Sequence, residues 1–187
     1  MTLKLLLAPA MALLLFACGT TESSKEASES DSKQDIAETT DTAGKEAVLF
    51  KDYGAEPFVF DIEAYTKQNN NFRTTLWTGK NMQMTLMSLK PGEEIGLEQH
   101  NELDQFIRVE EGTGTVYMGD TRDALTFQKK VEDDFAFFIP AGKWHNLVNT
   151  GDKTLKLYSI YAPVEHPHGT VHADKAAAEE AEKDHQH

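Results

Sequence analysis

The chain has 187 residues and a formal net charge of −13, with 31 acidic against 18 basic side chains. A nucleic-acid partner requires a basic surface, so this excess of acid argues against one. The only cysteine is Cys18, which excludes an internal disulfide. Residues 46–172 are long enough to form one domain with its own core.

The amino terminus carries one positive charge, Lys4, followed by an apolar run over residues 5–17. This run is too short to span a bilayer and is typical of a signal-peptide core, so residues 1–18 are excluded from the fold. The run ends in Leu-Phe-Ala-Cys at residues 15–18, which resembles a bacterial lipobox. The resemblance implies that cleavage leaves Cys18 as a lipidated first residue, attached to a membrane of the bacterial cell envelope. The alternative is a plain secretory signal with an incidental cysteine.

Residues 19–45 change character and are dominated by Ser, Thr, Glu and Asp. Such a segment cannot bury enough apolar surface to offset its ordering entropy. We therefore expect a disordered acidic tether that holds the folded part away from the lipid. An acidic sorting signal is the alternative function for this segment.

The folded region reads as many short extended segments separated by turn residues. We expect strands over residues 47–51, 58–62, 73–77, 82–89, 105–111, 113–119, 125–128, 135–139, 146–149 and 155–162. Residues 105–111 and 113–119 are expected to form a hairpin around Gly112. No helical periodicity precedes Asp174, and the Ala/Glu-rich residues 175–183 predict a short terminal helix, placing residues 173–187 in a helical or disordered tail. This pattern indicates an all-β jelly roll or barrel, without deciding between double-sheet folds.

The alternation of apolar and polar side chains predicts which faces of two strands are buried. Along residues 82–89 neither alternate set is strongly polar, which predicts a strand covered on both faces. If Gln105 faces inward, Ile107 and Val109 do so too, leaving Phe106 and Arg108 outside. An apolar side chain outside the barrel favours either a homodimer packed sheet to sheet or shielding by the amino-terminal segment.

Two distant stretches, residues 98–112 and 140–149, hold the candidate metal ligands. Glu98 and His100 are two apart, so on an extended strand they face the same side. Gln105 can join them from the next strand, and His145 follows a Pro/Gly turn. Two imidazoles, one carboxylate and one amide oxygen suit a divalent first-row metal.

The spacing of these residues resembles the two motifs of the cupins. The first motif runs Gly, five residues, His-x-His, three or four residues, Glu, six residues, Gly, and the second ends Pro-x-Gly, two residues, His, three residues, Asn. The matching positions are Gly92, His100, Gly112, Pro140, Gly142, His145 and Asn149. Three positions depart from the pattern: Glu98 replaces the first His, Gln105 replaces the Glu, and Asp134 replaces the second motif's opening Gly, in an expected turn. Glu98 and Gln105 keep metal-capable oxygens, so these departures bear on which metal binds.

Further short sequence segments resemble those of a compact bacterial cupin group that is often labelled mannose-6-phosphate isomerase-like. It includes Asn-Phe-Arg at residues 71–73, Trp-Thr-Gly-Lys at 77–80 and His-Pro at 166–167, and the likeness covers residues 46–178. The resemblance implies a cupin-type double-stranded β-helix, a jelly-roll barrel with a short C-terminal helix. It also implies one divalent ion, Mn, Fe, Ni or Zn, held by Glu98, His100, Gln105 and His145.

Only a few side chains are candidates for binding a substrate. Arg73 and Lys80 are candidates for binding an anionic group of a substrate, and Trp144 is a candidate for a ring contact. The alternatives are surface charges for Arg73 and Lys80 and a core or rim aromatic for Trp144. Arg108 and Arg122 are weaker candidates of the same kind. The histidines at 166, 168, 172, 185 and 187 could form a second metal patch, but their spacings match no standard metal motif and they are interpreted as parts of a loop and tail.

The function predicted from these features is a membrane-anchored metal-binding cupin that acts on or binds a small molecule, such as a sugar or sugar derivative, in the cell envelope. As an isomerase it would use the ion to polarise a sugar carbonyl, although no catalytic base is identified. The alternatives are a metal-dependent dioxygenase of an enolic substrate and a non-catalytic ligand- or metal-binding module.

Overall fold

The computed structural model describes residues 48–184. The predicted signal peptide, tether and lipidation site, and His185 and His187, lie outside this range. Between residues 48 and 184, no helix is long and apolar enough to cross a membrane.

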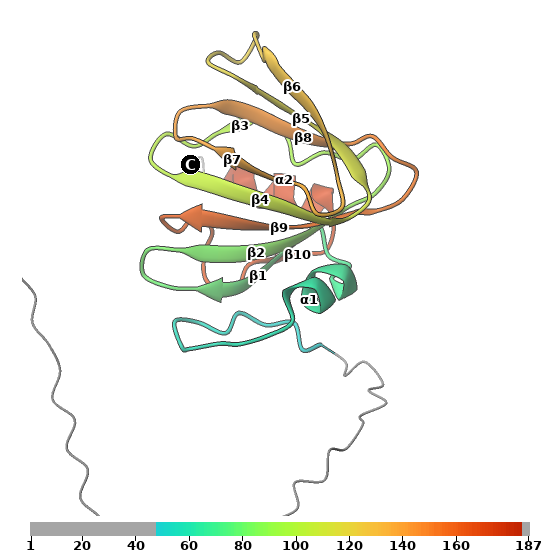
Figure 1. The fold of residues 1–187 in the computed structure, drawn as a ribbon. Coiled ribbons are helices and arrows are strands. Elements are labelled where there is room, and N and C mark those ends of the chain that lie inside the picture. The colour runs from blue at the N-terminus through green and yellow to red at the C-terminus, as the bar shows by residue number, and fades with distance from the viewer. Residues whose placement is uncertain (1–47, 185–187) are drawn as a thin grey trace, which may run out of the picture. The chain divides into compact units, whose positions relative to one another are not determined.

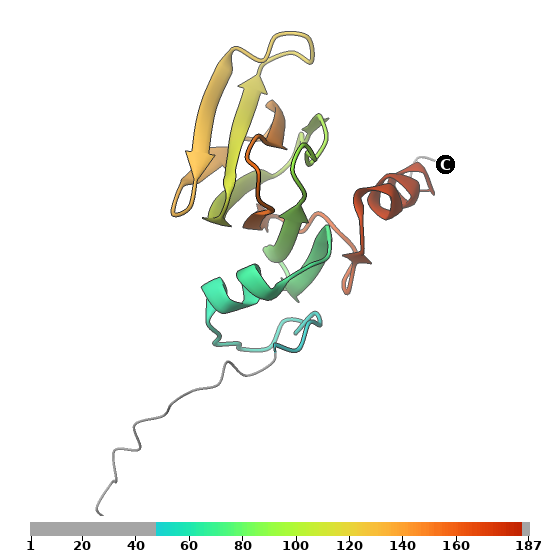
Figure 2. The ribbon, with the colours of Figure 1, turned by 90° about the vertical axis from the view of Figure 1, so that its right-hand side faces the viewer.

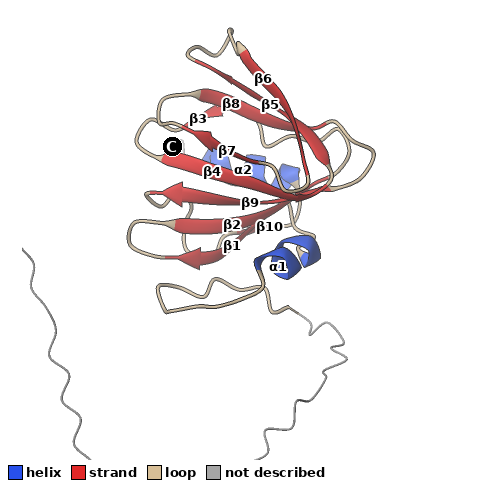
Figure 3. Cartoon of the chain, viewed as in Figure 1, coloured by secondary structure: helices blue, strands red, loops and turns tan. Residues whose placement is uncertain are grey.

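The described chain is built almost entirely of strands, with one helix before them and one after (Figure 3). The elements are α1 (Ile62–Gln68), β1 (Arg73–Thr78), β2 (Gln83–Leu89), β3 (Glu98–Gln99), β4 (Asp104–Glu111), β5 (Thr113–Gly119), β6 (Phe127–Glu132), β7 (Ala136–Ile139), β8 (Trp144–Asn149), β9 (Leu155–Ala162), β10 (Val171–His172) and α2 (Lys175–Asp184). The predicted terminal helix is present as α2.

The strands form two antiparallel sheets that face each other (Figure 1). One has the order β10-β1-β2-β9-β4-β7 and the other β3-β8-β5-β6. Their facing sides supply one apolar core, with members such as Leu157 from the first sheet and Leu147 from the second. The double-sheet jelly roll with a short C-terminal helix is therefore confirmed.

Alternation along the strands follows the predicted faces. In β4, Gln105, Ile107 and Val109 are buried, whereas Phe106 and Arg108 are only half-buried. Every residue of β2 is buried, as expected for a strand covered on both faces. This alternation matters for function because it turns the Gln105 side chain towards the interior.

The amino-terminal segment differs from the prediction, because residues 48–51 and 58–61 form no strand and helix α1 begins at Ile62. Asp61 caps this helix by accepting a hydrogen bond from the backbone N–H of Ala64 at 3.0 Å. Phe58 and Phe60 stack with ring centroids 4.7 Å apart and pack with Tyr65 against the outer apolar cluster of the large sheet. Phe58 and Phe60 are two residues apart, as residues on one face of a strand are, but the segment that carries them pairs with no strand.

Helix α1 contacts β9, β4 and β2, and it lies on the opposite side of the domain from α2 (Figure 2). Phe106 belongs to the same outer cluster as these aromatic side chains. Shielding of Phe106 by the amino-terminal segment, one of the two alternatives, is therefore observed. Phe138, which packs beside Phe106 at 5.1 Å between ring centroids, remains 73% exposed.

The predicted hairpin of residues 105–111 and 113–119 is wrong. Strand β4 pairs with β7 and β9, whereas β5 pairs with β6 and β8 in the other sheet. The chain crosses between sheets at Gly112, whose φ is 88° and where a Cβ atom would lie 2.8 Å from the Thr154 carbonyl oxygen. Only glycine fits both demands. Asp134 adopts a φ of 69° in a turn between β6 and β7, in agreement with its predicted turn position.

Candidate metal centre and pocket

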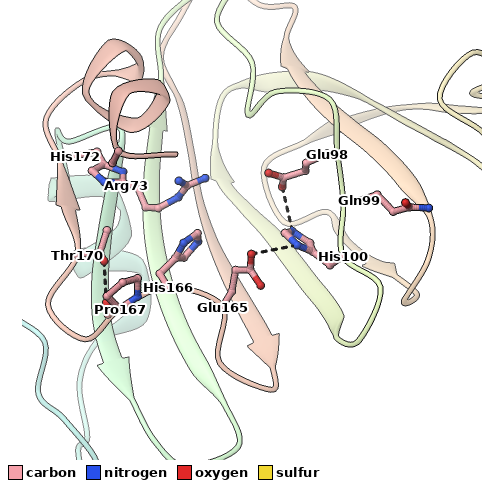
Figure 4. A pocket seen from close by; sticks show the side chains of 10 residues that line it. Arg73, Glu98, Gln99, His100, Glu165, His166, Pro167, Thr170 and His172 are labelled. Atoms are coloured by element: carbon pink, nitrogen blue, oxygen red, sulfur yellow. Dashed lines mark hydrogen bonds and ion pairs between the residues drawn. The ribbon is translucent and has the colours of Figure 1, made fainter. Parts of the chain in front are cut away.

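The pairing of β3 with β8 places the first candidate ligands opposite each other. Glu98 is the direct register partner of His145, and its Oε1 atom lies 3.2 Å from His145 Nε2. Strand β8 begins two residues earlier than predicted, so His145 is on the strand and fully buried. His100 follows β3, with Nε2 3.4 Å from Glu98 Oε1 (Figure 4).

The ligand atoms of Glu98, His100 and His145 all lie within 4.8 Å of one another. Donor atoms about 2.1 Å from a shared first-row ion stand up to about 4.2 Å apart, so only small movements are needed to surround one. His145 Nδ1 lies 3.0 Å from the Lys143 carbonyl oxygen, which can accept the Nδ1 proton, so Nε2, which faces Glu98, is the nitrogen that an ion would use.

Gln105 is 2% exposed on β4, and its amide is oriented by a neighbour. Its Nε2 donates to Ser159 Oγ at 2.8 Å, and this leaves Oε1 buried without a hydrogen bond from any described residue. His100 Nε2 is also buried; among residues 48–184 it forms an ion pair with Glu98 Oε1 at 3.4 Å but no hydrogen bond of good geometry. A buried polar atom without a hydrogen bond is costly. A metal ion would satisfy Gln105 Oε1 and would lie between Glu98 and His100, so the residues present fit the ion that the motif implies.

Charges within the cluster are strongly coupled. Burial alone would raise the pKa of Glu98, but the close contacts with the His100 and His145 rings outweigh it and hold that pKa below its ordinary value. Burial acts to lower the pKa of His100, yet Glu165 and Glu98 raise it to about 9. A divalent ion would take the place of the His100 proton at Nε2, which couples metal binding to proton release.

The titration of His100 gives a prediction for the metal-free protein. Because its pKa is about 9 in the folded state against 6.5 ordinarily, charged His100 stabilises the fold fully below pH 6.5. This stabilisation is lost as the pH rises towards 9. Urea unfolding at pH 6 and pH 9 should therefore show a larger loss of stability for the wild type than for His100→Gln. Equal losses in the two proteins would contradict the ion-pair geometry.

Glu165 is a candidate functional residue that the motifs did not reveal. It follows β9, and its Oε1 atom lies 3.3 Å from His100 Nδ1, on the side of the ring away from Glu98 (Figure 4). The hydrogen bond from His100 lowers the pKa of Glu165, so this side chain is a carboxylate. A carboxylate on one imidazole nitrogen orients the other nitrogen towards a metal. The only sequence feature that pointed to Glu165 was its position next to His166, which belongs to a segment shared with the bacterial group.

Glu165→Gln should weaken metal binding by about 10- to 100-fold, the usual cost of losing such an orienting carboxylate. Gln keeps the shape but accepts a weaker hydrogen bond from His100 Nδ1. Competition with a fluorescent chelator measures the change. Glu179→Gln, on the exposed part of α2, is the matched control and should leave the affinity unchanged. An unaltered affinity in Glu165→Gln would remove this residue from the centre.

The loop that carries Glu165 is anchored by Gln83, which is completely buried on β2. The backbone N–H of His166 donates to Gln83 Oε1, and Gln83 Nε2 donates to the His166 carbonyl oxygen, both at 2.8 Å. Gln83 Nε2 also donates to Thr78 Oγ1 at 3.0 Å. These bonds fix the loop against the large sheet and so position Glu165 beside His100.

A cavity of about 510 Å³ lies beside the candidate ligands (Figure 4). It is lined by Arg73, Glu98, Gln99, His100, Glu165, His166, Pro167, Thr170, His172 and Ala181. Its volume is in the range of pockets that take small ligands.

The three predicted substrate-binding residues are not brought together. Arg73 is buried and lines the cavity. Lys80 is exposed in the connection between β1 and β2, and it does not line the cavity. Trp144 is half-buried on β8 with the Arg122 guanidinium 5.6 Å from its ring centroid, and it also lies outside the cavity lining. His166 and His172, interpreted from sequence as incidental, belong to the lining.

Two facing antiparallel sheets with histidines and a carboxylate gathered at one end of the smaller sheet define a cupin. Residues 85–161 match the family model described as a cupin domain. This part of the chain is therefore a cupin domain.

Among its relatives, YrkC of Bacillus subtilis strain 168, an uncharacterized protein, is 61% identical over 135 residues, which cover 72% of this chain and 73% of that one. The crystal structure of BH2720 from Bacillus halodurans is 60% identical, with a TM-score of 0.69, and the match covers 70% of this chain and 98% of that one. The uncharacterized protein L612 of Acanthamoeba polyphaga mimivirus is 38% identical, with 61% and 70% covered.

Proposed function

We propose that this protein binds one divalent first-row ion through Glu98, His100, Gln105 and His145, and takes up a small molecule in the adjoining cavity. The observation that carries the proposal is the buried Gln105 Oε1 atom, which accepts no hydrogen bond from residues 48–184, beside a site that already gathers a carboxylate and two imidazoles within 4.8 Å. Manganese, iron, nickel and zinc all accept mixed nitrogen and oxygen donors, and the two oxygen donors favour manganese or iron. When bound, the ion would supply Lewis acidity towards an oxygen of the ligand.

Separate titrations of chelator-stripped protein with Mn²⁺, Fe²⁺, Ni²⁺ and Zn²⁺ test the proposal. We expect one ion per chain, and a gain in stability of about 2.7 kcal/mol at a free metal concentration 100 times the dissociation constant. Binding at less than one ion per ten chains for each of the four metals would overturn it.

Proton transfer next to a ligand carbonyl, as in sugar isomerisation, is a second candidate function. Glu165 favours it, because this carboxylate lines the cavity with a side chain that is 31% exposed. It supplies the base that the motifs lack. With levulinate as the test compound, the metal-loaded protein should exchange the hydrogens beside the ketone with D₂O, and Glu165→Gln, brought to the same metal occupancy by excess metal, should not. No exchange above that of free metal would restrict the protein to binding.

We further propose that the mature protein is a lipoprotein, anchored to the membrane through Cys18. The support is the apolar run that ends in a lipobox-like Leu-Phe-Ala-Cys. Cys18→Ser should move the protein from the membrane fraction to the soluble fraction of its bacterial host, as measured by fractionation and immunoblotting. A wild type that is already soluble, or a variant that stays bound, would contradict the anchor.

A further inference from the structure

We infer that Ser159 is a positioning residue of the candidate metal centre: its hydroxyl determines that the Gln105 amide presents its oxygen, and not its NH₂ group, to the ion. This inference rests on the proposed metal-binding function and deepens it, because it concerns how one ligand of the same site is oriented. An amide oxygen has lone pairs for a cation, whereas the NH₂ group offers only hydrogens. The orientation of this amide therefore decides whether Gln105 can act as a ligand.

The register of two neighbouring strands places Ser159 and Gln105 on the same face of the large sheet. Strands β4 and β9 lie side by side (Figure 1), and Gln105 is the register partner of Tyr161. Ser159 lies two residues before Tyr161 on β9, so it points to the same face and is the diagonal neighbour of Gln105. Ser159 is completely buried and Gln105 is 2% exposed. Both side chains are shielded from bulk solvent, so the groups around them decide their orientation.

The direction of the hydrogen bond follows from a second contact of Ser159. A hydroxyl can donate or accept, so on its own it could face either end of an amide. Ser159 Oγ also donates to the Phe106 carbonyl oxygen at 3.4 Å. A carbonyl oxygen only accepts, so this contact directs the single Ser159 proton towards Phe106 and leaves the hydroxyl lone pairs for a donor. Gln105 Nε2 is that donor, at 2.8 Å.

This arrangement fixes the other end of the amide as well. With Nε2 bound to Ser159, Gln105 Oε1 is left buried and accepts no hydrogen bond from any residue between 48 and 184. A reversed amide would set its oxygen against a hydroxyl whose proton is engaged by Phe106, and would leave the NH₂ group without an acceptor. Ser159 therefore disfavours the one orientation in which Gln105 cannot bind a cation.

A second hydroxyl close to Ser159 does not share this role. Thr85 on β2 is the register partner of Ser159, and it is also completely buried. Its Oγ1 atom makes no hydrogen bond to any described residue. Thr85 is therefore a buried polar neighbour that does not orient Gln105, and Thr85→Val, which keeps the shape, is a local control.

Dissociation constants for whichever of the four titrated ions binds the wild type most tightly test the role of Ser159. Ser159→Ala should weaken binding by about tenfold, the lower end of the usual cost of losing an orienting group, because an amide oxygen is a weak ligand. Ser159→Thr keeps the hydroxyl and should stay within about threefold of the wild type, as should Thr85→Val. Urea unfolding of the metal-free proteins measures any purely structural cost separately.

Changes at Gln105 distinguish positioning from a general structural effect. Gln105→Glu replaces the amide with a carboxylate, which has an oxygen at either end, so either end can face the ion. Adding Ser159→Ala to Gln105→Glu should therefore cost less than about threefold in affinity. Adding Ser159→Ala to Gln105→Ala, which has no amide to orient, should cost equally little.

The outcomes separate the two claims. A wild type that binds none of the four ions would overturn the proposed function. One ion per chain with unchanged affinity in Ser159→Ala or in Gln105→Ala would overturn the positioning role alone. An equal loss from Ser159→Ala with glutamine, glutamate or alanine at position 105 would also overturn it, because the effect would not pass through the amide. A folded Ser159→Thr or Thr85→Val with as large a loss as Ser159→Ala would do the same.

Discussion

His145→Ala should purify without stoichiometric metal, with an affinity more than about 100-fold below that of the wild type. Loss of an orienting neighbour alone costs about 10- to 100-fold, and this change removes a nitrogen donor outright. His145 is completely buried opposite Glu98 on β8, and alanine would leave Glu98 with a single histidine partner. Metal analysis by mass spectrometry after purification without chelator measures the ratio of ion to chain.

Two further variants make this result specific. His168→Ala removes a 61% exposed histidine outside the cavity lining and should leave the metal ratio at its wild-type value. Gln105→Ala should be milder than His145→Ala, because water can replace a neutral amide oxygen as ligand. Equal metal content in His145→Ala and the wild type would remove His145 from the centre.

Leu147→Ala should destabilise the protein by about 2–5 kcal/mol, the usual cost of such a deletion in a core. Leu147 lies on β8 two residues after His145, is fully buried and belongs to the core shared by the two sheets. Alanine would leave a cavity in the strand that carries a candidate ligand. Urea unfolding of the metal-free protein measures the change without a contribution from bound metal.

Leu49→Ala is the matched control, because the same atoms are deleted from a side chain that is 62% exposed. It should cost less than about 0.5 kcal/mol. A loss in Leu147→Ala no larger than in Leu49→Ala would contradict the packing of the two sheets.

The features predicted well from sequence are those encoded by local spacing. Alternation along residues 105–109 gave the inward face of β4, and the motif gaps selected Glu98, His100 and His145, whose ligand atoms the structure brings within 4.8 Å. Helix α1 was missed because Phe58, Phe60 and Ile62 alternate like a strand, although Asp61 provides a helix cap. A cap residue without a longer helical period is too weak a signal.

The features that were missed depend on contacts between distant segments. The hairpin at Gly112 was predicted because its two strands are adjacent in sequence. In the structure β4 pairs with β9 and β5 pairs with β8, and sequence adjacency carries no information about these pairings. Glu165 approaches His100 only because Gln83, more than 80 positions earlier, binds the His166 backbone. Gln83 belongs to no motif, and His166 belongs only to a segment shared with the bacterial group, so sequence spacing could not predict that Glu165 reaches His100.

The most direct measurement of the central claim is anomalous diffraction from crystals of the metal-loaded protein at the absorption edge of the bound ion. The proposed centre predicts one strong peak per chain, within bonding distance of Glu98 Oε1, the Nε2 atoms of His100 and His145, and Gln105 Oε1. A fully loaded protein with its peak elsewhere, or with no peak among these four side chains, would contradict the centre.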